Sequence, residues 1–278
     1  MRRVSTTAPH GWIVPDWPAP AGVQALCTTR QGGFSSAPYD TLNLGSHVGD
    51  AAGDVLRNRA RLQSHLASLT PGARLFIHSQ VHGTTTLALT AQSDPAVVQE
   101  ADAFCTAVPG AVCAVLVADC LPVLLAHRSG RAVAAAHAGW RGLAGQGGFG
   151  VLESALHALA QTLQQPLEVV APETLAWLGP CIGPTAFEVG DEVAEAFCRH
   201  DQASAACFAA GAAPGKHWAD LAGLARRRLD RLGVVAVYGN DSSGSWCTVG
   251  NPLRFFSHRR DTGRLGGSGR FAACIWRG

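Results

Sequence analysis

Residues 111–142, AVCAVLVADCLPVLLAHRSGRAVAAAHAGWRG, contain the three apolar runs that decide the fold of this chain. The runs cover residues 114–118, 121–126 and 131–136. Apolar runs of this length, bounded by polar residues, are typical of buried β-strands. The first two are interrupted by Asp119-Cys120, and the third ends in His137. We therefore predict buried strands whose ends carry polar side chains, where scaffolds commonly present chemistry.

Further strands and helices are predicted on both sides of this region. Leu56, Leu62, Leu66 and Leu69 recur at helical spacing. In one continuous strand over residues 75–89, His78, Gln80 and His82 would share a face, because side chains alternate along a strand. The patterns predict helices over 55–69, 151–163, 191–198 and 220–232, and strands over 23–29, 75–89, 175–178, 234–238 and 271–276.

The composition indicates one large globular domain. The chain has 278 residues, of which 47% are hydrophobic and 15% charged. This is enough apolar material for a sizeable core and too much for a disordered chain. We expect residues 1–278 to form a single domain. The net charge of +2 supplies no field that would recruit nucleic acid or an anionic membrane, so neither is expected as a partner.

A reducing, cytoplasmic location is predicted. Arg2 and Arg3 are followed by no apolar run, which argues against a signal peptide. No stretch reaches the roughly 18 apolar residues that a membrane-spanning helix needs. The nine cysteines are scattered and form no C-x-x-C pair. We expect no structural disulfide.

Three polar islands interrupt the apolar background: Gln80-Val81-His82-Gly83, Ala118-Asp119-Cys120-Leu121-Pro122 and His137-Ala138-Gly139-Trp140-Arg141-Gly142. Two imidazoles and one thiolate form a donor set that suits zinc and is acceptable to copper. Three protein ligands leave one tetrahedral position open, which is the catalytic pattern. Spacing alone leaves a simpler interpretation open, in which the histidines are structural and the cysteine fills the core.

These islands, together with the segments Gly179-Pro-Cys-Ile-Gly-Pro184 and Phe255-Phe-Ser-His-Arg-Arg-Asp261, strongly resemble the laccase-domain (YfiH-like polyphenol oxidase) family. The resemblance covers nearly the whole chain in the same order. It implies an α/β fold of the α+β type, with a single compact domain of layered mixed β-sheets flanked by helices. It also implies that His82, Cys120 and His137 bind the metal and carry catalysis, with Zn²⁺ as the first choice and Cu²⁺ as the alternative.

The same resemblance implies an activity. Family members phosphorolyse adenosine, inosine and methylthioadenosine, and they deaminate adenosine. We therefore expect a metal-dependent purine nucleoside phosphorylase with adenosine deaminase activity through a metal-activated water. Its partners would be purine nucleosides and phosphate.

Several other polar residues are candidates for substrate binding. An arginine can donate two parallel hydrogen bonds to a phosphate, Asn43 can bind a ribose or purine edge, and Glu188 can act as a general acid or base. The simpler alternatives are surface ion pairs, a turn at Asn43 and a solvated carboxylate at Glu188. His78 lies where other family members commonly carry an apolar residue, and Asp119 can either orient a ligand or cap a turn. The predicted substrate-binding residues are Arg30, Asn43, Arg141, Glu188, Arg259 and Arg260.

Three other functions remain open. A copper-dependent, laccase-like polyphenol oxidase would normally need several coppers and more histidine ligands than this trio. A metal-free hydrolase would use Cys120 as nucleophile and His137 as its base. A non-catalytic binding partner would show no turnover. The metal content of the purified protein separates the metal enzyme from the metal-free hydrolase.

Overall fold

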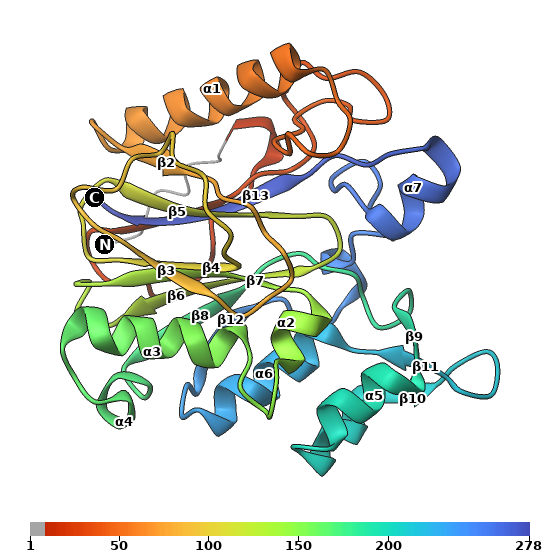
Figure 1. The fold of residues 1–278 in the computed structure, drawn as a ribbon. Helices are drawn as coiled ribbons and strands as arrows, with labels where there is room; N and C mark the ends of the chain where they lie inside the picture. The colour runs from red at the N-terminus through yellow and green to blue at the C-terminus, as the bar shows by residue number, and fades with distance from the viewer. Residues whose placement is uncertain (1–8) are drawn as a thin grey trace.

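Two β-sheets lie face to face in the computed structural model, which describes residues 9–278 (Figure 1). Residues 1–8 lie outside the described part of the chain, and so do Arg2 and Arg3, on which the prediction of no signal peptide rests. The four-stranded sheet has the order β1 (Val23–Cys27), β13 (Phe271–Arg277), β5 (Ala111–Val117) and β2 (Arg74–Phe76). The six-stranded sheet has the order β12 (Ala236–Gly239), β8 (Thr174–Leu178), β6 (Leu121–His127), β7 (Val133–Ala138), β4 (Ala103–Thr106) and β3 (Thr86–Leu89).

Both sheets combine parallel and antiparallel pairs. In the four-stranded sheet β2 runs parallel to β5, whereas β13 is antiparallel to both of its neighbours. In the six-stranded sheet β12–β8 and β3–β4 are parallel pairs, and the other pairs are antiparallel. A small third sheet contains β10 (Phe208–Ala210), β11 (Lys216–Ala219) and β9 (Glu188–Gly190). The predicted fold of layered mixed sheets is confirmed.

Helices cover the outer faces of the two large sheets, so the layers follow the order helix, sheet, sheet, helix (Figure 1). Helix α1 (Ala52–Leu69) lies over the four-stranded sheet. The opposite side carries α2 (Trp140–Ala144), α3 (Val151–Leu163), α4 (Leu167–Val170) and α6 (Leu221–Arg231). Helix α5 (Asp191–Cys198) lies beside the small sheet, and α7 (His258–Leu265) precedes β13. Among residues 9–278, no helix is both long and apolar enough to cross a membrane.

The continuous apolar runs are explained by burial on both faces of the central strands. In β5, Cys113 and Val115 pack between the two sheets, whereas Val112 and Ala114 pack toward the α1 side. A strand that is buried on both faces does not need the apolar–polar alternation of a half-exposed strand. This is why the runs in residues 111–142 predict strands without an alternating pattern.

The predicted continuous strand over residues 75–89 is wrong. Strand β2 belongs to the four-stranded sheet and β3 to the six-stranded sheet, so the chain crosses between layers over residues 77–85. His82 lies in this connection with a φ of 60°, in the left-handed region that an extended strand cannot contain. The strand-like alternation therefore does not place His78, Gln80 and His82 on one strand face.

The apolar stripe predicted for α1 is only half correct. Leu62 and Leu66 are fully buried, but Leu56 and Leu69 are 67% and 48% exposed. Val55 and the polar Asn58 occupy the buried face instead. The Asn58 amide nitrogen donates to the carbonyl oxygen of Asn43 at 2.8 Å, so a hydrogen bond explains the burial of a polar residue.

We propose that residues 1–278 form one cooperative domain, because the core between the sheets draws on both of them. Leu124 is fully buried there and pairs with Trp177 across β6 and β8. Leu124→Ala should lower the free energy of unfolding by about 2–5 kcal/mol through lost contacts and a cavity. Tryptophan fluorescence and far-ultraviolet circular dichroism, followed during urea denaturation, should report the same decrease.

Leu253→Ala is the matched control, because Leu253 is 80% exposed and its truncation should change stability by less than about 0.5 kcal/mol. If Leu124→Ala changed the urea denaturation curve measured by fluorescence but not the one measured by circular dichroism, or the reverse, the layers would unfold separately.

Candidate metal centre

The three predicted metal ligands come together where the chain crosses between the sheets. His82 lies in the connection between β2 and β3, Cys120 directly precedes β6, and His137 belongs to β7. Their nitrogen and sulfur ligand atoms all lie within 4.8 Å of one another. The Cys120 Sγ atom is 3.6 Å from His82 Nε2.

Strand register brings Cys120 and His137 to the same end of the sheet. Antiparallel β6 and β7 pair Leu121 with Ala138, so Cys120 lies beside Gly139. A Cβ atom at Gly139 would meet the His82 ring at 2.8 Å and the Cys120 sulfur at 3.1 Å. Glycine at this position therefore leaves the space in which the ligands meet.

A buried carboxylate that the sequence analysis missed organises the site. Asp102 directly precedes β4 and is fully buried. Its Oδ1 accepts hydrogen bonds from the His137 Nδ1 at 2.8 Å and from the His82 backbone N–H at 2.9 Å. Its Oδ2 accepts from the backbone N–H groups of Gly83 at 2.7 Å and Val81 at 3.2 Å. One side chain thus fixes the backbone at one histidine and the ring of the other.

These contacts shift the protonation of the cluster. Burial raises the pKa of Cys120, but the charge of His137 and hydrogen bonds from His137 and His82 outweigh it and bring the pKa to about 6. Burial lowers the pKa of His137, but the thiolate of Cys120 and the Asp102 carboxylate raise it to about 9. Burial likewise raises the pKa of Asp102, and its hydrogen bonds bring the pKa below the ordinary value. At neutral pH the metal-free site therefore contains a thiolate beside an imidazolium.

The donor set and the Cys120–His82 distance fit a zinc-type site. Tetrahedral zinc with bonds of about 2.0–2.3 Å places its ligand atoms about 3.3–3.6 Å apart, which the Cys120–His82 distance of 3.6 Å already matches. Because His137 Nδ1 donates to Asp102, Nε2 is the ring nitrogen left for a metal, in the carboxylate–histidine arrangement common around metal ions. Among residues 9–278 this is the only group of three or more potential ligands found. That these residues bind a metal remains a prediction.

A pocket of about 390 Å³ opens from the cluster. The three ligands line one wall, and Leu116, Trp140, Ile182 and Phe187 contribute apolar surface. The basic side chains around the pocket are Arg141, Arg259 and Arg270, with His47 and His258 beside them. A concave, largely apolar site with a few polar groups is typical of small-molecule binding.

Two of the predicted substrate-binding residues line this pocket. The Arg141 guanidinium lies 4.4 Å from the Trp140 ring. Arg259 donates to the carbonyl oxygens of Ala186 and Glu188 at 3.2–3.4 Å. The Glu188 carboxylate accepts a hydrogen bond from the backbone of Ala212 and is outside the pocket lining.

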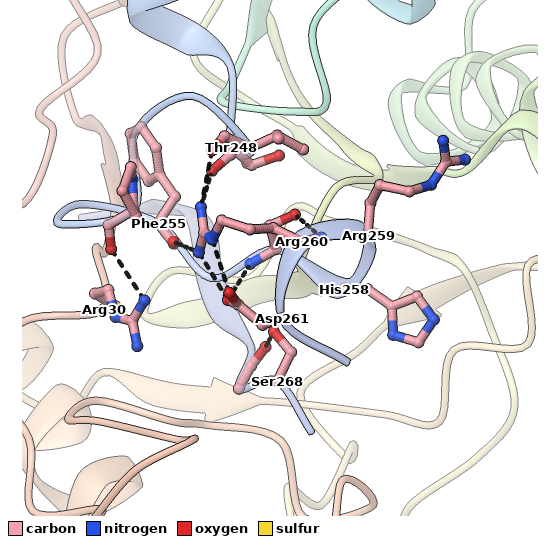
Figure 2. A network of polar contacts seen from close by, with 12 residues as sticks. Arg30, Thr248, Phe255, His258, Arg259, Arg260, Asp261 and Ser268 are labelled. Carbon is pink, nitrogen blue, oxygen red and sulfur yellow. Dashed lines mark hydrogen bonds and ion pairs between the residues drawn. The ribbon is translucent and has the colours of Figure 1, made fainter. Parts of the chain in front are cut away.

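The other predicted substrate-binding residues, Arg30, Asn43 and Arg260, are also outside the pocket lining. Figure 2 shows the Arg260 guanidinium surrounded by Asp261 and by the backbone at Thr248 and Phe255, whereas the Arg259 side chain extends away from that network. Arg30 forms an ion pair with Asp40 at 3.0 Å. Their described contacts are structural, and substrate binding by these residues stays a prediction.

His78 and Asp119, the two ambiguous residues beside the motifs, now have defined contacts. His78 lines the pocket but is not part of the ligand cluster; its Nδ1 accepts a hydrogen bond from the Gln99 backbone and its ring stacks on Phe104 at 5.0 Å. Asp119 accepts from the Thr248 hydroxyl and from the Arg259 backbone N–H. Asp119 therefore links the connection between β5 and β6 to Thr248 and to the first turn of α7.

Comparisons with known proteins agree with the fold and the motifs. A model of the family described as multi-copper polyphenol oxidoreductase laccase matches residues 24–278. A purine nucleoside phosphorylase of Pseudomonas aeruginosa is 46% identical over 267 residues, which cover 96% of this chain and 98% of the relative. The purine nucleoside phosphorylase YfiH of Escherichia coli is 46% identical over 265 residues, covering 95% and 98%.

Two solved structures are similar to this chain over nearly their whole length. A protein of Neisseria meningitidis superposes with a TM-score of 0.82 at 43% identity, covering 96% of this chain and 98% of that one. YlmD from Geobacillus stearothermophilus superposes with a TM-score of 0.79 at 32% identity, covering 97% of both chains.

The pKa of Cys120 leads to a measurable prediction for metal-free protein. Iodoacetamide reacts with a thiolate, so alkylation of Cys120 should be half-maximal near pH 6 and should slow as the pH falls and the thiolate is protonated. Cys198 is the internal control, because burial raises its pKa and it should react only at higher pH. Peptide mapping distinguishes the two sites, and a half-maximum near pH 9 for Cys120 would contradict the described electrostatics.

Proposed function

The chain belongs to the multi-copper polyphenol oxidoreductase laccase family, and from this membership we propose that it is a metal-dependent purine nucleoside phosphorylase. Phosphorolysis breaks the bond between the purine nitrogen and the ribose anomeric carbon, and an oxygen of phosphate forms the new bond to that carbon. The products are a free purine, which takes up a proton, and ribose 1-phosphate. The observation that carries this proposal is the His82, Cys120 and His137 cluster in the wall of a pocket with basic side chains.

The pocket offers different surfaces to the parts of a nucleoside and to phosphate. Trp140 and Phe187 supply apolar aromatic surface, and aromatic rings stack favourably on purine bases. Arginine side chains can hold phosphate through paired charge-assisted hydrogen bonds. Adenosine, inosine and methylthioadenosine are the proposed nucleosides, and the cytoplasm is the proposed location of the reaction.

A metal ion in the cluster would supply Lewis-acid chemistry and make water more acidic, which is the basis of the adenosine deaminase activity proposed beside phosphorolysis. We propose zinc as this ion, with copper as the alternative. The Asp102 carboxylate contributes by holding the His137 ring, so that one imidazole nitrogen stays directed at the cluster. The Gly139 position contributes by keeping space between His82 and Cys120.

A metal-free hydrolase is a second candidate, and one observation favours it. Cys120, His137 and Asp102 form a chain of interacting groups in which the thiol has a pKa of about 6 and the imidazole is oriented by a carboxylate. Nucleophile, base and orienting group stand in this relationship in many cysteine hydrolases. A copper-dependent polyphenol oxidase is favoured less, because residues 9–278 contain only one group of potential ligands, whereas a multi-copper mechanism requires several.

Cys120→Ser and His137→Ala separate the metal enzyme from the cysteine hydrolase. Loss of a ligand should lower the bound zinc and reduce phosphate-dependent inosine turnover by at least about 100-fold, the upper end of the effect of removing a group that only orients a ligand. Metal analysis is run beside turnover with and without phosphate. Cys198→Ser, a half-buried cysteine outside the cluster, should keep both properties.

Two outcomes would contradict the proposal. Full turnover by carefully demetallated wild-type protein would favour the cysteine hydrolase. Purine release that does not depend on phosphate would indicate hydrolysis of the nucleoside in place of phosphorolysis.

A further inference from the structure

We propose that Arg270 is the main anion-binding residue of the pocket, that it takes inorganic phosphate, and that the Asn43-Leu44-Gly45 segment positions it. This inference rests on the proposed phosphorolysis and identifies where its second substrate binds. Arg270 is not among the substrate-binding residues predicted from the sequence, and Asn43 was predicted to bind the nucleoside.

Arg270 has hydrogen-bond donors available in the pocket. Its side chain is half-buried and lines the same cavity as the metal-ligand cluster. Nη1 donates to the carbonyl oxygens of Ser268 at 2.9 Å and Gly269 at 3.0 Å. Within the described range 9–278, neither Nε nor Nη2 has a hydrogen-bond partner, and no carboxylate lies within ion-pair distance of the guanidinium. One side of the guanidinium is anchored, and the other side can bind a ligand.

The charge balance at Arg270 favours an anion. Burial lowers the pKa of Arg270, because removing a cation from water is unfavourable, and the charges of Cys120, Asp119 and Tyr39 offset only part of this effect. Asp119, the carboxylate that lines the pocket, already accepts hydrogen bonds from Thr248 and the Arg259 backbone. A half-buried guanidinium without an ion-pair partner is stabilised when an anion binds.

The segment before α1 holds the backbone of Arg270 from two directions. The Asn43 side-chain oxygen accepts a hydrogen bond from the Arg270 N–H at 2.8 Å. The Leu44 N–H donates to the Arg270 carbonyl oxygen at 3.0 Å. Asn43 is itself fully buried and donates to Asp50 at 2.9 Å. Asn43 therefore acts as a positioning residue for Arg270.

Gly45 makes room for the side chain of Arg270. A Cβ atom at Gly45 would lie 2.9 Å from Arg270 Cγ and 3.2 Å from its Cβ. These atoms belong to the stem of the arginine near the backbone, which cannot move aside as easily as the guanidinium. Any larger residue at position 45 should displace the Arg270 side chain.

Other basic side chains of the pocket lie around Arg270. Arg141, Arg259, His47 and His258 line the same pocket. The pKa of His47 is lowered by burial and also by the charges of Arg270 and Arg59, which places these groups close together. Arg30 and Arg260 cannot provide the same function without losing their ion pairs to Asp40 and Asp261. Of the three arginines that line the pocket, Arg270 is the half-buried one, and it has no ion-pair partner among residues 9–278.

Steady-state kinetics on the zinc-loaded full chain test this inference through the separate KM values for phosphate and inosine. Arg270→Gln should raise the KM for phosphate about 10- to 100-fold, the effect of losing charge-assisted hydrogen bonds, and should leave the KM for inosine and the zinc content unchanged. The phosphate KM of Arg270→Lys should fall between those of the wild type and Arg270→Gln, because lysine keeps the charge but lacks the planar guanidinium. Gly45→Ala should shift the phosphate KM in the same direction as Arg270→Gln. Arg264→Gln, at an exposed position on α7 outside the pocket lining, is the control and should match the wild type.

Calorimetric titration of inorganic phosphate without nucleoside provides a readout that does not depend on turnover. The wild type should bind phosphate, and Arg270→Gln should bind it at least about 10-fold more weakly. Titration with adenosine 5′-monophosphate distinguishes free phosphate from a phosphate ester. Tighter binding of the nucleotide than of phosphate, lost in Arg270→Gln, would overturn the assignment to inorganic phosphate.

The possible failures are distinguishable. Phosphate-dependent turnover with an unchanged phosphate KM in folded Arg270→Gln would overturn this inference and leave the proposed function intact. A wild type without phosphorolysis would refute the proposed function, and the phosphate titrations would still decide whether Arg270 binds the anion. If Arg270→Gln does not fold, Arg270→Lys and Gly45→Ala test the proposal instead. It would be refuted if both variants bound phosphate as tightly as the wild type and had the same phosphate KM.

Discussion

The Asp102 carboxylate is the interaction on which the candidate site depends. Its two oxygens accept hydrogen bonds from three consecutive backbone N–H groups, at Val81, His82 and Gly83, and from the His137 ring. A fully buried charge is unfavourable unless such bonds replace its contacts with water. The same carboxylate therefore fixes the connection between the two sheets and orients a predicted metal ligand. It also stabilises the left-handed backbone at His82.

The spacing of apolar residues predicted the helices, because an amphipathic helix depends on residues close together in sequence. Helices α3 and α5 begin and end where predicted. The helix predicted over residues 220–232 corresponds to α6, which Asp220 caps by accepting a hydrogen bond from the Gly223 backbone. The break between β2 and β3 was not predictable, because an apolar alternation does not reveal that its two halves join different sheets. Asp102 was missed for a similar reason: it is a single acidic residue whose partners lie 19 to 35 residues away in sequence. The motifs located the three predicted ligands, but not the group that holds them.

The basic residues illustrate the limits of motif-based assignment. Arg259 and Arg260 are adjacent, yet one lines the pocket and the other forms an ion pair with Asp261. Sequence alone cannot separate them, because the difference depends on which way each side chain points from the start of α7 (Figure 2). The metal-ligand cluster and Arg270 line the same pocket, and the Asn43-Leu44-Gly45 segment links Arg270 to α1. A phosphate and a nucleoside would then meet in this pocket.

The zinc affinity of Asp102→Asn tests the central claim most directly. An asparagine side chain keeps the size of the aspartate but has no charge and only one acceptor oxygen. In either orientation its NH₂ group therefore faces N–H donors, either those of His82 and His137 or those of Val81 and Gly83. The account predicts that zinc affinity, measured by competition with a chromophoric chelator, falls by about 10- to 100-fold, whereas Asp16→Asn, at an exposed position, has no effect. Circular dichroism establishes that both variants are folded. A folded Asp102→Asn protein with wild-type zinc affinity would contradict the account.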